Sequence, residues 1–468
     1  MLKNSFLIYG SPGTGKTTYL INLLRDLFLW YDPNQISFVS FTKKGAYEGR
    51  DRAIKEFKFS ENDFPYFRTI HSLAFRALGV SRYDIISKQH YRNFSSAMGM
   101  SFLGYYTEDL SNSDDKYLSC FSLYKNNPII AREYVDALDI KKFAYVANNY
   151  TRYKLEKNVI DFDDLIIRFI KNGLALPVKI ALIDEAQDLT SLQWRFCEVA
   201  FKNCERIYIS GDDDQAIYEW SGADLKYFFA LGGFSHRTTL EKTWRLKQNI
   251  FDVSEKLVKK ITSRVEKLVS PLSENGGIFY YNDLSDVKIN KEETYYFLSR
   301  NNYFLTRIKA HVMKFGFNFL IKGEPFFKKA LYNAILKYEN YRKHSPDKLM
   351  GDVLLKTFLR TDLPAGIYPP WYDAFSLDIE VSNFIRNFFA FGSKIDDLKI
   401  TVGTIHSVKG GEADNVVLIM DITKNVNSNF IKNPDSEIRV LYVALTRARK
   451  NLHIVFSDTK FGYDSILQ

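Results

Sequence analysis

A glycine-rich stretch that begins at Gly10 constrains the fold of this chain more than any other feature. The apolar run Phe6–Tyr9 leads directly into it, the apolar-rich run Tyr19–Trp30 follows, and the stretch itself reads Gly-Ser-Pro-Gly-Thr-Gly-Lys-Thr-Thr. Strand, glycine-rich loop and helix in this order are typical of a loop that binds the phosphates of a nucleoside triphosphate. A turn that merely caps a helix is the alternative interpretation, but the motif and its flanking elements together favour a phosphate site.

The residue types in this stretch explain how it would hold phosphate. Glycines let backbone N–H groups approach the phosphate oxygens, which a side chain would block, and the N-terminus of the following helix favours negative charge. Lys16 would reach the outer phosphates, and the hydroxyl of Thr17 would ligate Mg²⁺. The predicted phosphate-binding residues are Gly10, Ser11, Pro12, Gly13, Thr14, Gly15, Lys16, Thr17 and Thr18.

An acidic pair follows a second apolar strand. The run Val178–Ile183 is followed directly by Asp184 and Glu185. A strand that ends in Asp-Glu is what the second half of a phosphate-loop site requires. Asp184 would hold Mg²⁺, and Glu185 would orient and deprotonate the attacking water.

A further strand, predicted over Arg206–Ser210, leads into a loop that carries Gln215 and Trp220. A glutamine at a strand tip can sense the terminal phosphate, and an aromatic residue on the same loop could couple that phosphate to a second ligand. A polar turn beside a core tryptophan is the simpler interpretation.

Composition sets bounds on the class of protein. At 468 residues the length predicts about two to four domains. The net charge of +9 and the aromatic content of 16% are compatible with nucleic acid as a partner, although many basic proteins bind nothing anionic. The three cysteines form no disulfide framework and no four-ligand metal set, and they fit a reducing cytosol. We expect no signal peptide before the first strand and no membrane-spanning segment.

Several other segments carry weaker signals. Residues 80–150 are polar and rich in Tyr and Lys, residues 323–393 are rich in Phe and Tyr, and both are typical of insertions. Aromatic residues in the second of these could stack on bases, but core packing is their more common role. The carboxylates at Asp161, Asp163 and Asp164 could suggest a metal, although acidic residues at a helix N-terminus need none.

Two helices are predicted in the second half of the chain. Helical periodicity runs over 247–268, and Ser270-Pro271 indicates a boundary. A second helix is predicted over 439–449, where an arginine pair two apart is normally a solvated face. Arg447 is surrounded by apolar residues and therefore could point into an interface.

Taken together, these motifs resemble the UvrD/Rep-like branch of the superfamily 1 helicases. The resemblance covers most of the chain outside the two insertions, and the joint order of the motifs is very specific. The motifs read, in order, GSPGTGKTT, SFTKKGAYE, TIHSLA, LIDEAQDLTSLQ, GDDDQAIYEWSGAD, LEKTWR, TIHSVKGGEADNVVLI and VLYVALTRARKNL.

The resemblance implies an α/β fold with two RecA-like P-loop NTPase domains, each built on a parallel sheet and each carrying a mainly helical insertion. The expected limits are 1–79 and 151–245 for the first domain, with its insertion at 80–150. They are 246–322 and 394–468 for the second domain, with a short insertion at 323–393.

The resemblance also implies roles for individual residues, with ATP and Mg²⁺ as ligands. Arg245 and Arg447 match two arginines that reach the terminal phosphate, Glu412 matches an acidic residue near the sugar, and Trp244 stands where a base-stacking tyrosine is usual. The implied catalytic set is Lys16, Asp184, Glu185, Gln215, Arg245 and Arg447, with Thr17 and Asp184 at the metal and Gln187 among the nucleotide contacts. The implied single-strand path is lined by Phe41, Thr42, His71, Trp220, Thr404 and His406.

The implied function is an ATP-dependent helicase or translocase that moves 3′→5′ on single-stranded DNA, or on DNA with a single-stranded tail, as ATP closes the cleft between the domains. A clamp switched by ATP, or a translocase that strips proteins without unwinding, is the alternative, and RNA stays open as the track. Replication, repair or recombination proteins are the expected partners, and no membrane association is expected. The expected location is the cytoplasm or the nucleoid, or the host cytoplasm for a viral protein.

Three departures from the family pattern stand out. Nine residues precede Gly10, so we expect the glutamine-containing element that reads adenine upstream to be absent, and base recognition to rest on Trp244. Ser221 replaces the usual arginine after Trp220. The second insertion, about 70 residues long, is shorter than in large family members. This short insertion motivates the alternative function, a clamp or translocase that does not unwind DNA.

Overall fold

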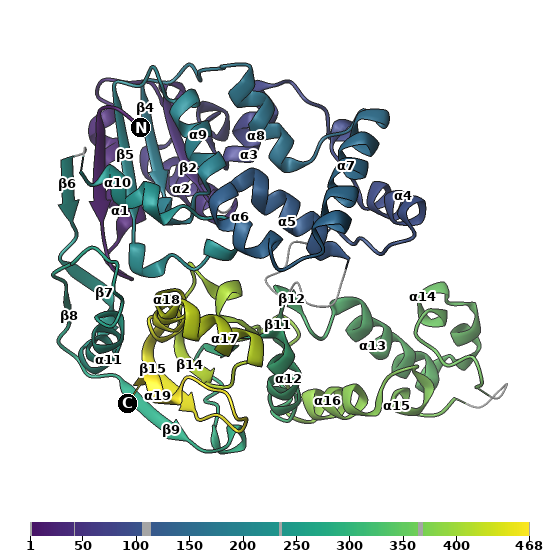
Figure 1. Cartoon of the computed structure of the whole chain (residues 1–468). Helices are drawn as coiled ribbons and strands as arrows, with labels where there is room; N and C mark the ends of the chain where they lie inside the picture. The colour runs from purple at the N-terminus through teal and green to yellow at the C-terminus, as the bar shows by residue number, and fades with distance from the viewer. Residues whose placement is uncertain (1, 42, 105–113, 234–235, 364–367, 468) are drawn as a thin grey trace. The chain divides into compact units, whose positions relative to one another are not determined.

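The computed structural model describes residues 2–41, 43–104, 114–233, 236–363 and 368–467. The chain divides into two compact units, each with its own sheet (Figure 1). The first unit consists of Met1–Arg245, Ile261–Leu272 and Asp435–Arg439. The second consists of Leu246–Lys260, Ser273–Pro434 and Val440–Gln468.

The first unit is built on a six-stranded sheet with the order β3-β2-β4-β5-β1-β6. Every neighbouring pair in it is parallel. Loops that follow parallel strands leave from the same edge of a sheet, which is where α/β proteins bind ligands. The strands are β1 (Ser5–Tyr9), β2 (Ile36–Ser40), β3 (Phe67–Arg68), β4 (Ile180–Asp184), β5 (Arg206–Gly211) and β6 (His236–Thr239).

Helices cover both faces of this sheet because its strands are apolar on both sides. Ile8 and Phe38 face one layer, which contains α1 (Lys16–Leu27) and α2 (Lys43–Phe57). Leu7 and Val39 face the opposite layer. That layer contains α3 (Ile70–Ala77), α8 (Phe162–Lys171), α9 (Ser191–Ala200) and α10 (Leu225–Leu231) (Figure 1). The predicted α/β class is confirmed.

The predicted insertion at 80–150 is mainly helical in residues 80–104 and 114–150, the part that the structure describes. A separate hydrophobic core that includes Phe94, Tyr117, Val146 and Tyr150 holds it together. Its exact limits stay a prediction. The helices of this region are α4 (Lys88–Met98), α5 (Asp115–Asn126), α6 (Pro128–Val135) and α7 (Ile140–Glu156).

A buried ionic cluster ties α5 and α7 to the start of α8. The ammonium groups of Lys125 and Lys154 lie 2.9 Å and 2.5 Å from the same carboxylate oxygen of Asp161, and both lysines also contact Asp164. Asp161 additionally caps α8 by accepting the N–H of Asp164. Asp163 accepts from Ser122 and Asn126. Lysines compensate the charges of Asp161 and Asp164, and Asp161 caps α8.

The second unit is built on a seven-stranded sheet with the order β12-β11-β13-β10-β14-β15-β9. Its pairs are parallel except for β11 with β12. The strands are β9 (Gly277–Tyr281), β10 (Tyr295–Ser299), β11 (Phe319–Ile321), β12 (Glu324–Pro325), β13 (Ile400–Thr404), β14 (Ala413–Ile419) and β15 (Ala448–Val455).

Helices from the predicted second insertion share a core with this sheet. Tyr338, Trp371 and Phe384 belong to the same hydrophobic cluster as Phe297 and Val402 of the strands. These insertion aromatics therefore pack in the core, which was the simpler expectation. The helices that follow residue 245 are α11 (Gln248–Val258), α12 (Leu305–Met313), α13 (Lys329–His344), α14 (Val353–Lys356), α15 (Trp371–Ala374), α16 (Ile379–Ala390), α17 (Lys424–Lys432), α18 (Pro434–Leu445) and α19 (Asp464–Leu467).

The helix predicted over 247–268 is wrong beyond Val258. Residues 261–272 belong to the first unit, and Ser270-Pro271 begins β8 (Ser270–Leu272), which pairs with β7 (Lys242–Lys247); the chain passes into the second unit directly after Leu272, close to the predicted boundary. The carboxylate of Asp435 accepts the N–H groups of Thr262 and Ser263, so these amides are bonded to a side chain instead of a helical carbonyl.

The helix predicted over 439–449 is also wrong at its C-terminal end. α18 ends at Leu445, Thr446 and Arg447 form a turn, and Arg449 lies in β15. The guanidinium group of Arg447 donates to the carbonyl oxygens of Val443 and Gly411, and these bonds fix the turn. The two arginines therefore do not share a helix.

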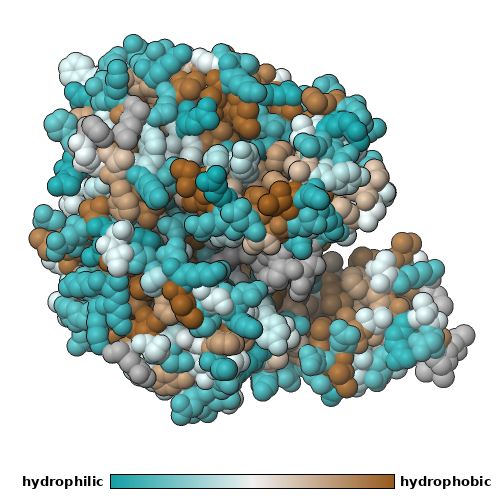
Figure 2. Space-filling view, viewed as in Figure 1, coloured by the Kyte–Doolittle hydropathy of each residue, from teal (hydrophilic) through white to brown (hydrophobic). Residues whose placement is uncertain are grey.

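Polar residues cover most of the surface in Figure 2, and hydrophobic residues appear there in separate groups. Among the described helices, none is both long enough and apolar enough to cross a membrane.

Replacing Lys154 by Met should strongly destabilise the first unit. The side chain is 6% exposed, and its loss would leave Asp161 and Asp164 with less positive charge in a buried site. Removing one partner of a buried ion pair typically costs about 3–5 kcal/mol. Urea unfolding would measure the free-energy change. Lys157→Met, at an exposed position just after α7, is the matched control and should change stability by less than about 0.5 kcal/mol; equal losses in both variants would contradict the role of the cluster.

Candidate functional site

The carboxyl edge of the first sheet collects most of the predicted site residues. The glycine-rich loop follows β1, Asp184 ends β4, and Gln215 lies shortly after β5. Strand β6 leads to β7, which carries Trp244 and Arg245. Because these strands are parallel, residues that are far apart in the sequence meet at one edge.

The glycine-rich loop has the geometry of a phosphate cradle. Gly13 and Gly15 have φ angles of +76° and +82°, which side chains rarely allow. Lys16 begins α1, is buried, and its ammonium group lies 2.7 Å from the carbonyl oxygen of Gly10. The buried hydroxyl of Ser11 has no hydrogen-bond partner among the described residues. A buried ammonium and an unsatisfied hydroxyl inside a glycine loop fit an anionic, hydrogen-bonding ligand.

Thr17 and Asp184 form the predicted metal pair. The hydroxyl of Thr17 donates to one carboxylate oxygen of Asp184 over 2.6 Å, and Ser210 and the N–H of Glu185 donate to the other. Burial raises the pKa of Asp184, and the nearby charge of Glu185 raises it further. A hydroxyl beside a carboxylate suits Mg²⁺, and a cation here would compensate the buried negative charge, so the residues fit the predicted ion.

Glu185 has a left-handed backbone with φ of 53°, which is uncommon for a residue with a side chain. Such strain is often found at functional sites. The amide of Gln187 donates to the Glu185 carboxylate over 2.6 Å, and its oxygen accepts the N–H of Asp212 over 3.0 Å. Gln187, one of the expected nucleotide contacts, is fully buried and links Glu185 to the loop after β5.

Gln215 is also held by Asp212. Its side-chain amide donates to the Asp212 carboxylate over 2.6 Å, and only 5% of Gln215 is exposed. Gln215 therefore has a defined orientation beside the acidic pair. The structure thus brings Asp184, Glu185 and Gln215 into one hydrogen-bonded group through Gln187 and Asp212.

Strand β7 is attached to the glycine-rich loop. The hydroxyl of Thr243 donates to the carbonyl of Pro12, and the N–H of Trp244 donates to the carbonyl of Gly13, both over 2.8 Å. A Cβ atom at Gly13 would lie 2.4 Å from the Cβ of Arg245, so only glycine allows this approach. Sequence reasoning missed Thr243, because its hydroxyl partner is a carbonyl 231 residues away.

Trp244 offers an open aromatic surface next to the loop. The residue is 67% exposed, and the ammonium group of Lys242 lies 4.1 Å from its ring centroid. Thr18 lies in the first turn of α1, and its hydroxyl accepts a hydrogen bond from Arg52 of α2.

Residues of the predicted single-strand path in the first unit form two aromatic groups. The ring of Tyr218 lies 5.2 Å from Phe41 and 6.4 Å from Trp220. His71 meets Phe162 edge-on at 5.7 Å, and desolvation lowers the pKa of His71 to about 4, so its ring is neutral at pH 7. Sequence reasoning missed Tyr218, although it lies inside a recognised motif, and Phe162, which lies among the carboxylates Asp161, Asp163 and Asp164. The predicted residue Thr42 lies outside the described residues.

The remaining predicted residues lie at two edges of the second sheet. Glu412 and Arg447 directly precede the parallel strands β14 and β15, at their amino ends. Arg447 is 1% exposed and bonds the carbonyl of Gly411, next to Glu412, which brings these two predicted residues together. Thr404 ends β13, and His406 follows it at the carboxyl edge.

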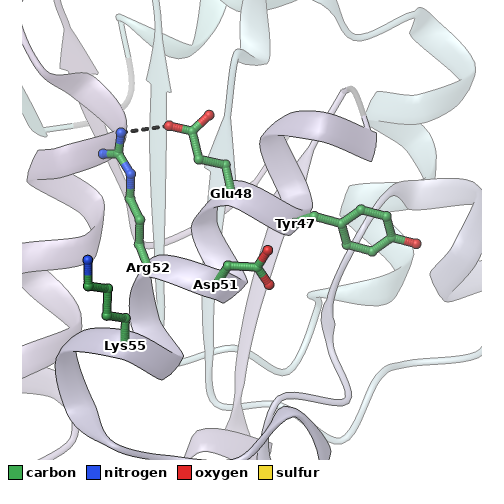
Figure 3. Close-up of a pocket in the computed structure, with 5 residues that line it drawn as sticks. All are labelled: Tyr47, Glu48, Asp51, Arg52 and Lys55. Atoms are coloured by element: carbon green, nitrogen blue, oxygen red, sulfur yellow. Dashed lines mark hydrogen bonds and ion pairs between the residues drawn. The ribbon is translucent and has the colours of Figure 1, made fainter. Parts of the chain in front are cut away.

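A hollow on α2 lies outside this constellation. Tyr47, Glu48, Asp51, Arg52 and Lys55 line it, and Figure 3 shows Arg52 turned toward Glu48, with which it forms an ion pair of 2.6 Å. These side chains come from one helix and include both charges, so the hollow has no defined charge preference.

Two family models match this chain. Residues 1–233 match the model of the UvrD/REP helicase N-terminal domain, and residues 382–459 match that of the UvrD-like helicase C-terminal domain. The two ranges together cover roughly two thirds of the 468 residues.

Three relatives show the extent of the similarity. The chain is 29% identical over 246 residues to the ATP-dependent DNA helicase Rep of Buchnera aphidicola subsp. Acyrthosiphon pisum (strain APS), covering 48% of this chain and 38% of the relative. It is 27% identical over 294 residues to the ATP-dependent DNA helicase PcrA of Leuconostoc citreum, covering 58% and 39%. It is 24% identical over 388 residues to the Rep helicase of Buchnera aphidicola subsp. Schizaphis graminum (strain Sg), covering 78% and 55%.

The chain therefore matches between 38% and 55% of the length of these three relatives. The domains of this family are RecA-like P-loop folds, in agreement with the parallel sheet of the first unit and the mainly parallel sheet of the second. On its two domain matches and on the residues gathered at the carboxyl edge of its first sheet, this chain belongs to the UvrD/REP helicase family.

Proposed function

We propose that this protein hydrolyses ATP to move along single-stranded DNA as a helicase or translocase. One observation carries the proposal: Lys16, Thr17, Asp184, Glu185 and Gln215 meet at one sheet edge, where Thr17 and Asp184 are 2.6 Å apart. The relatives described above, whose names are ATP-dependent DNA helicases, support the same activity.

Each side chain of the nucleotide site has a defined task in this proposal. The backbone of the glycine-rich loop and the ammonium group of Lys16 bind the phosphates. Thr17 and Asp184 would hold Mg²⁺, which neutralises phosphate charge when bound. Glu185 accepts a proton from the attacking water, and Gln215 orients that water or contacts the terminal phosphate. The exposed indole of Trp244 stacks on the base.

A single loop could couple this chemistry to DNA. Gln215 and the aromatic residues Tyr218 and Trp220 follow the same strand, β5, so a shift of the loop at the phosphate would also move the aromatic pair. Stacking on aromatic rings tolerates any base, as a motor requires. We include Phe41, Thr42, His71, Thr404 and His406 in the proposed path.

We further propose that the two predicted domains, with the limits given above, close around ATP. In the closed state Arg245 and Arg447 would both reach the terminal phosphate and stabilise the charge of the transition state, with Glu412 near the sugar. Hydrolysis would remove this differential affinity, and the cleft would reopen. Movement 3′→5′, partners in replication, repair or recombination, and a cytoplasmic or nucleoid location belong to the same proposal.

A second candidate is an ATP-driven translocase or clamp that does not separate strands. One observation favours it: α13, α15 and α16 of the predicted second insertion share a core with the second sheet. Forked duplexes with 3′, 5′ or no tails, made of DNA or RNA, distinguish the candidates. ATP-dependent separation of the 3′-tailed DNA supports the helicase, and translocation without separation supports the second candidate.

Replacing Lys16 by Ala should abolish ATP turnover. The loss of the ammonium group removes charge stabilisation at the phosphates, which should lower kcat by about 100-fold or more. Turnover would be measured with and without single-stranded DNA, which should stimulate the wild-type protein strongly. Lys55→Ala, at an exposed position of α2, is the matched control and should hydrolyse ATP normally. Turnover in Lys16→Ala equal to that of the wild-type protein would refute the proposed site.

Replacing Trp244 by Ala should weaken nucleotide binding. A base stacked on an aromatic ring contributes about 1–3 kcal/mol, so the KM for ATP should rise by roughly 5- to 150-fold, whereas Trp244→Phe should keep most of the affinity. Steady-state kinetics with ATP and GTP would measure both variants. An unchanged KM in Trp244→Ala would exclude this residue from the nucleotide site.

Replacing Trp220 by Ala should weaken binding of single-stranded DNA while the turnover without DNA stays unchanged. The lost stacking should raise the Kd by roughly 5- to 150-fold, which fluorescence anisotropy with a labelled oligonucleotide would measure. Trp30→Ala is the matched control, because Trp30 is an exposed tryptophan beyond the end of α1. If both variants bind DNA equally well, Trp220 does not lie on the path.

A further inference from the structure

A lysine from outside the recognised motifs is buried among three consecutive aspartates of the loop after β5. The ammonium group of Lys267 lies 3.1 Å from Asp212, 2.5 Å from Asp213 and 2.9 Å from Asp214, and all four side chains are fully shielded from solvent. Both segments belong to the first unit. The three carboxylates are close enough together to hold a metal ion, but here a lysine compensates their charge.

Neighbouring groups complete the cluster without replacing Lys267. Arg264 pairs with both carboxylate oxygens of Asp214, over 3.0 Å and 2.8 Å. The N–H of Val265 donates to Asp213 over 2.7 Å. Arg439 donates to the backbone carbonyl of Asp213. These contacts fix Asp213 and Asp214, whereas Lys267 also reaches Asp212.

Asp212 connects this cluster to the proposed catalytic residues. One of its carboxylate oxygens contacts Lys267, and the other accepts the side-chain amide of Gln215 over 2.6 Å. Its N–H donates to Gln187, whose amide in turn donates to Glu185. A displacement of Asp212 would therefore act directly on Gln215, whereas it would reach Glu185 only through Gln187.

Charge determines whether Asp212 can keep this position. Burial opposes its ionisation, but Lys267 and Lys16 hold the pKa of Asp212 below its usual range. Asp213 is less well compensated, since burial raises its pKa to about 6. Without the ammonium group, adjacent buried carboxylates would repel one another in a medium of low dielectric constant. Asp212 would then become protonated or move, and either change would alter its bond to Gln215.

We propose that Lys267 is a positioning residue for ATP hydrolysis, which holds Asp212 so that Asp212 orients Gln215. This inference rests on the proposed function. A purely structural lysine would stabilise the fold and leave the chemical step unchanged, so the two roles differ in what they do to kcat.

Steady-state ATPase measurements on Lys267→Met test the proposal. Misplaced catalytic groups cost up to about 100-fold in rate, so kcat should fall by about 10- to 100-fold while the KM for ATP changes little. Arg264→Met is the matched control, because it removes one positive charge from the same cluster at Asp214. It should lower the thermal midpoint by a similar amount but keep kcat within about 2-fold of wild type.

Combining Lys267→Met with Gln215→Ala tests whether Lys267 acts on kcat through Gln215. Gln215→Ala alone should lower kcat, and adding Lys267→Met to it should cause little further loss, because residues that act through one contact are not additive. Fully additive losses would overturn the route through Gln215. A kcat of Lys267→Met equal to that of wild type, or equal to that of Arg264→Met, would overturn the proposal.

Two controls keep the outcome decisive. If Lys267→Met does not fold, combining it with Asp213→Asn keeps the net charge of the cluster, and the same criteria apply to that double variant. Wild-type protein without ATP turnover would refute the proposed function and this role together. Wild-type turnover that Lys16→Ala abolishes and the Lys267 variant retains would refute the positioning role alone.

Discussion

The parallel arrangement of the first sheet is the constraint on which the site depends. Its strands are apolar on both faces, so helices cover both sides, and every neighbouring pair of strands is parallel. The polar residues that follow the strands therefore collect at one edge. Burial of the strands and assembly of the nucleotide site are two results of the same pattern of apolar residues.

Residues with local chemistry could be predicted from the sequence. The glycine-rich loop, Asp184 and Glu185 each follow an apolar run within a few residues, so strand and motif support each other. The α/β class and the helical character of 80–150 follow from similar local patterns. The resemblance to the family added the residues whose roles depend on positions far along the chain, such as Arg245 and Arg447.

Contacts over long sequence separations could not be predicted in this way. Lys267 meets Asp213 across 54 residues, and Thr243 meets Pro12 across 231. The periodicity around 259–268 indicates a helix, but the pairing of Lys267 with the aspartates overrides that local preference. Likewise, the bonds of the Arg447 side chain end α18 earlier than its apolar pattern indicates.

The interleaving of the two units along the chain affects how the protein is made. The three aspartates emerge from the ribosome well before Lys267, and Arg439 follows much later, although all of them belong to the first unit. Until Lys267 has been synthesised, the nascent loop carries three carboxylates without their buried cation, and these carboxylates must stay hydrated. The first unit can therefore reach its final packing only late in synthesis, and a fragment that ends near residue 245 would lack the charges that its own site requires.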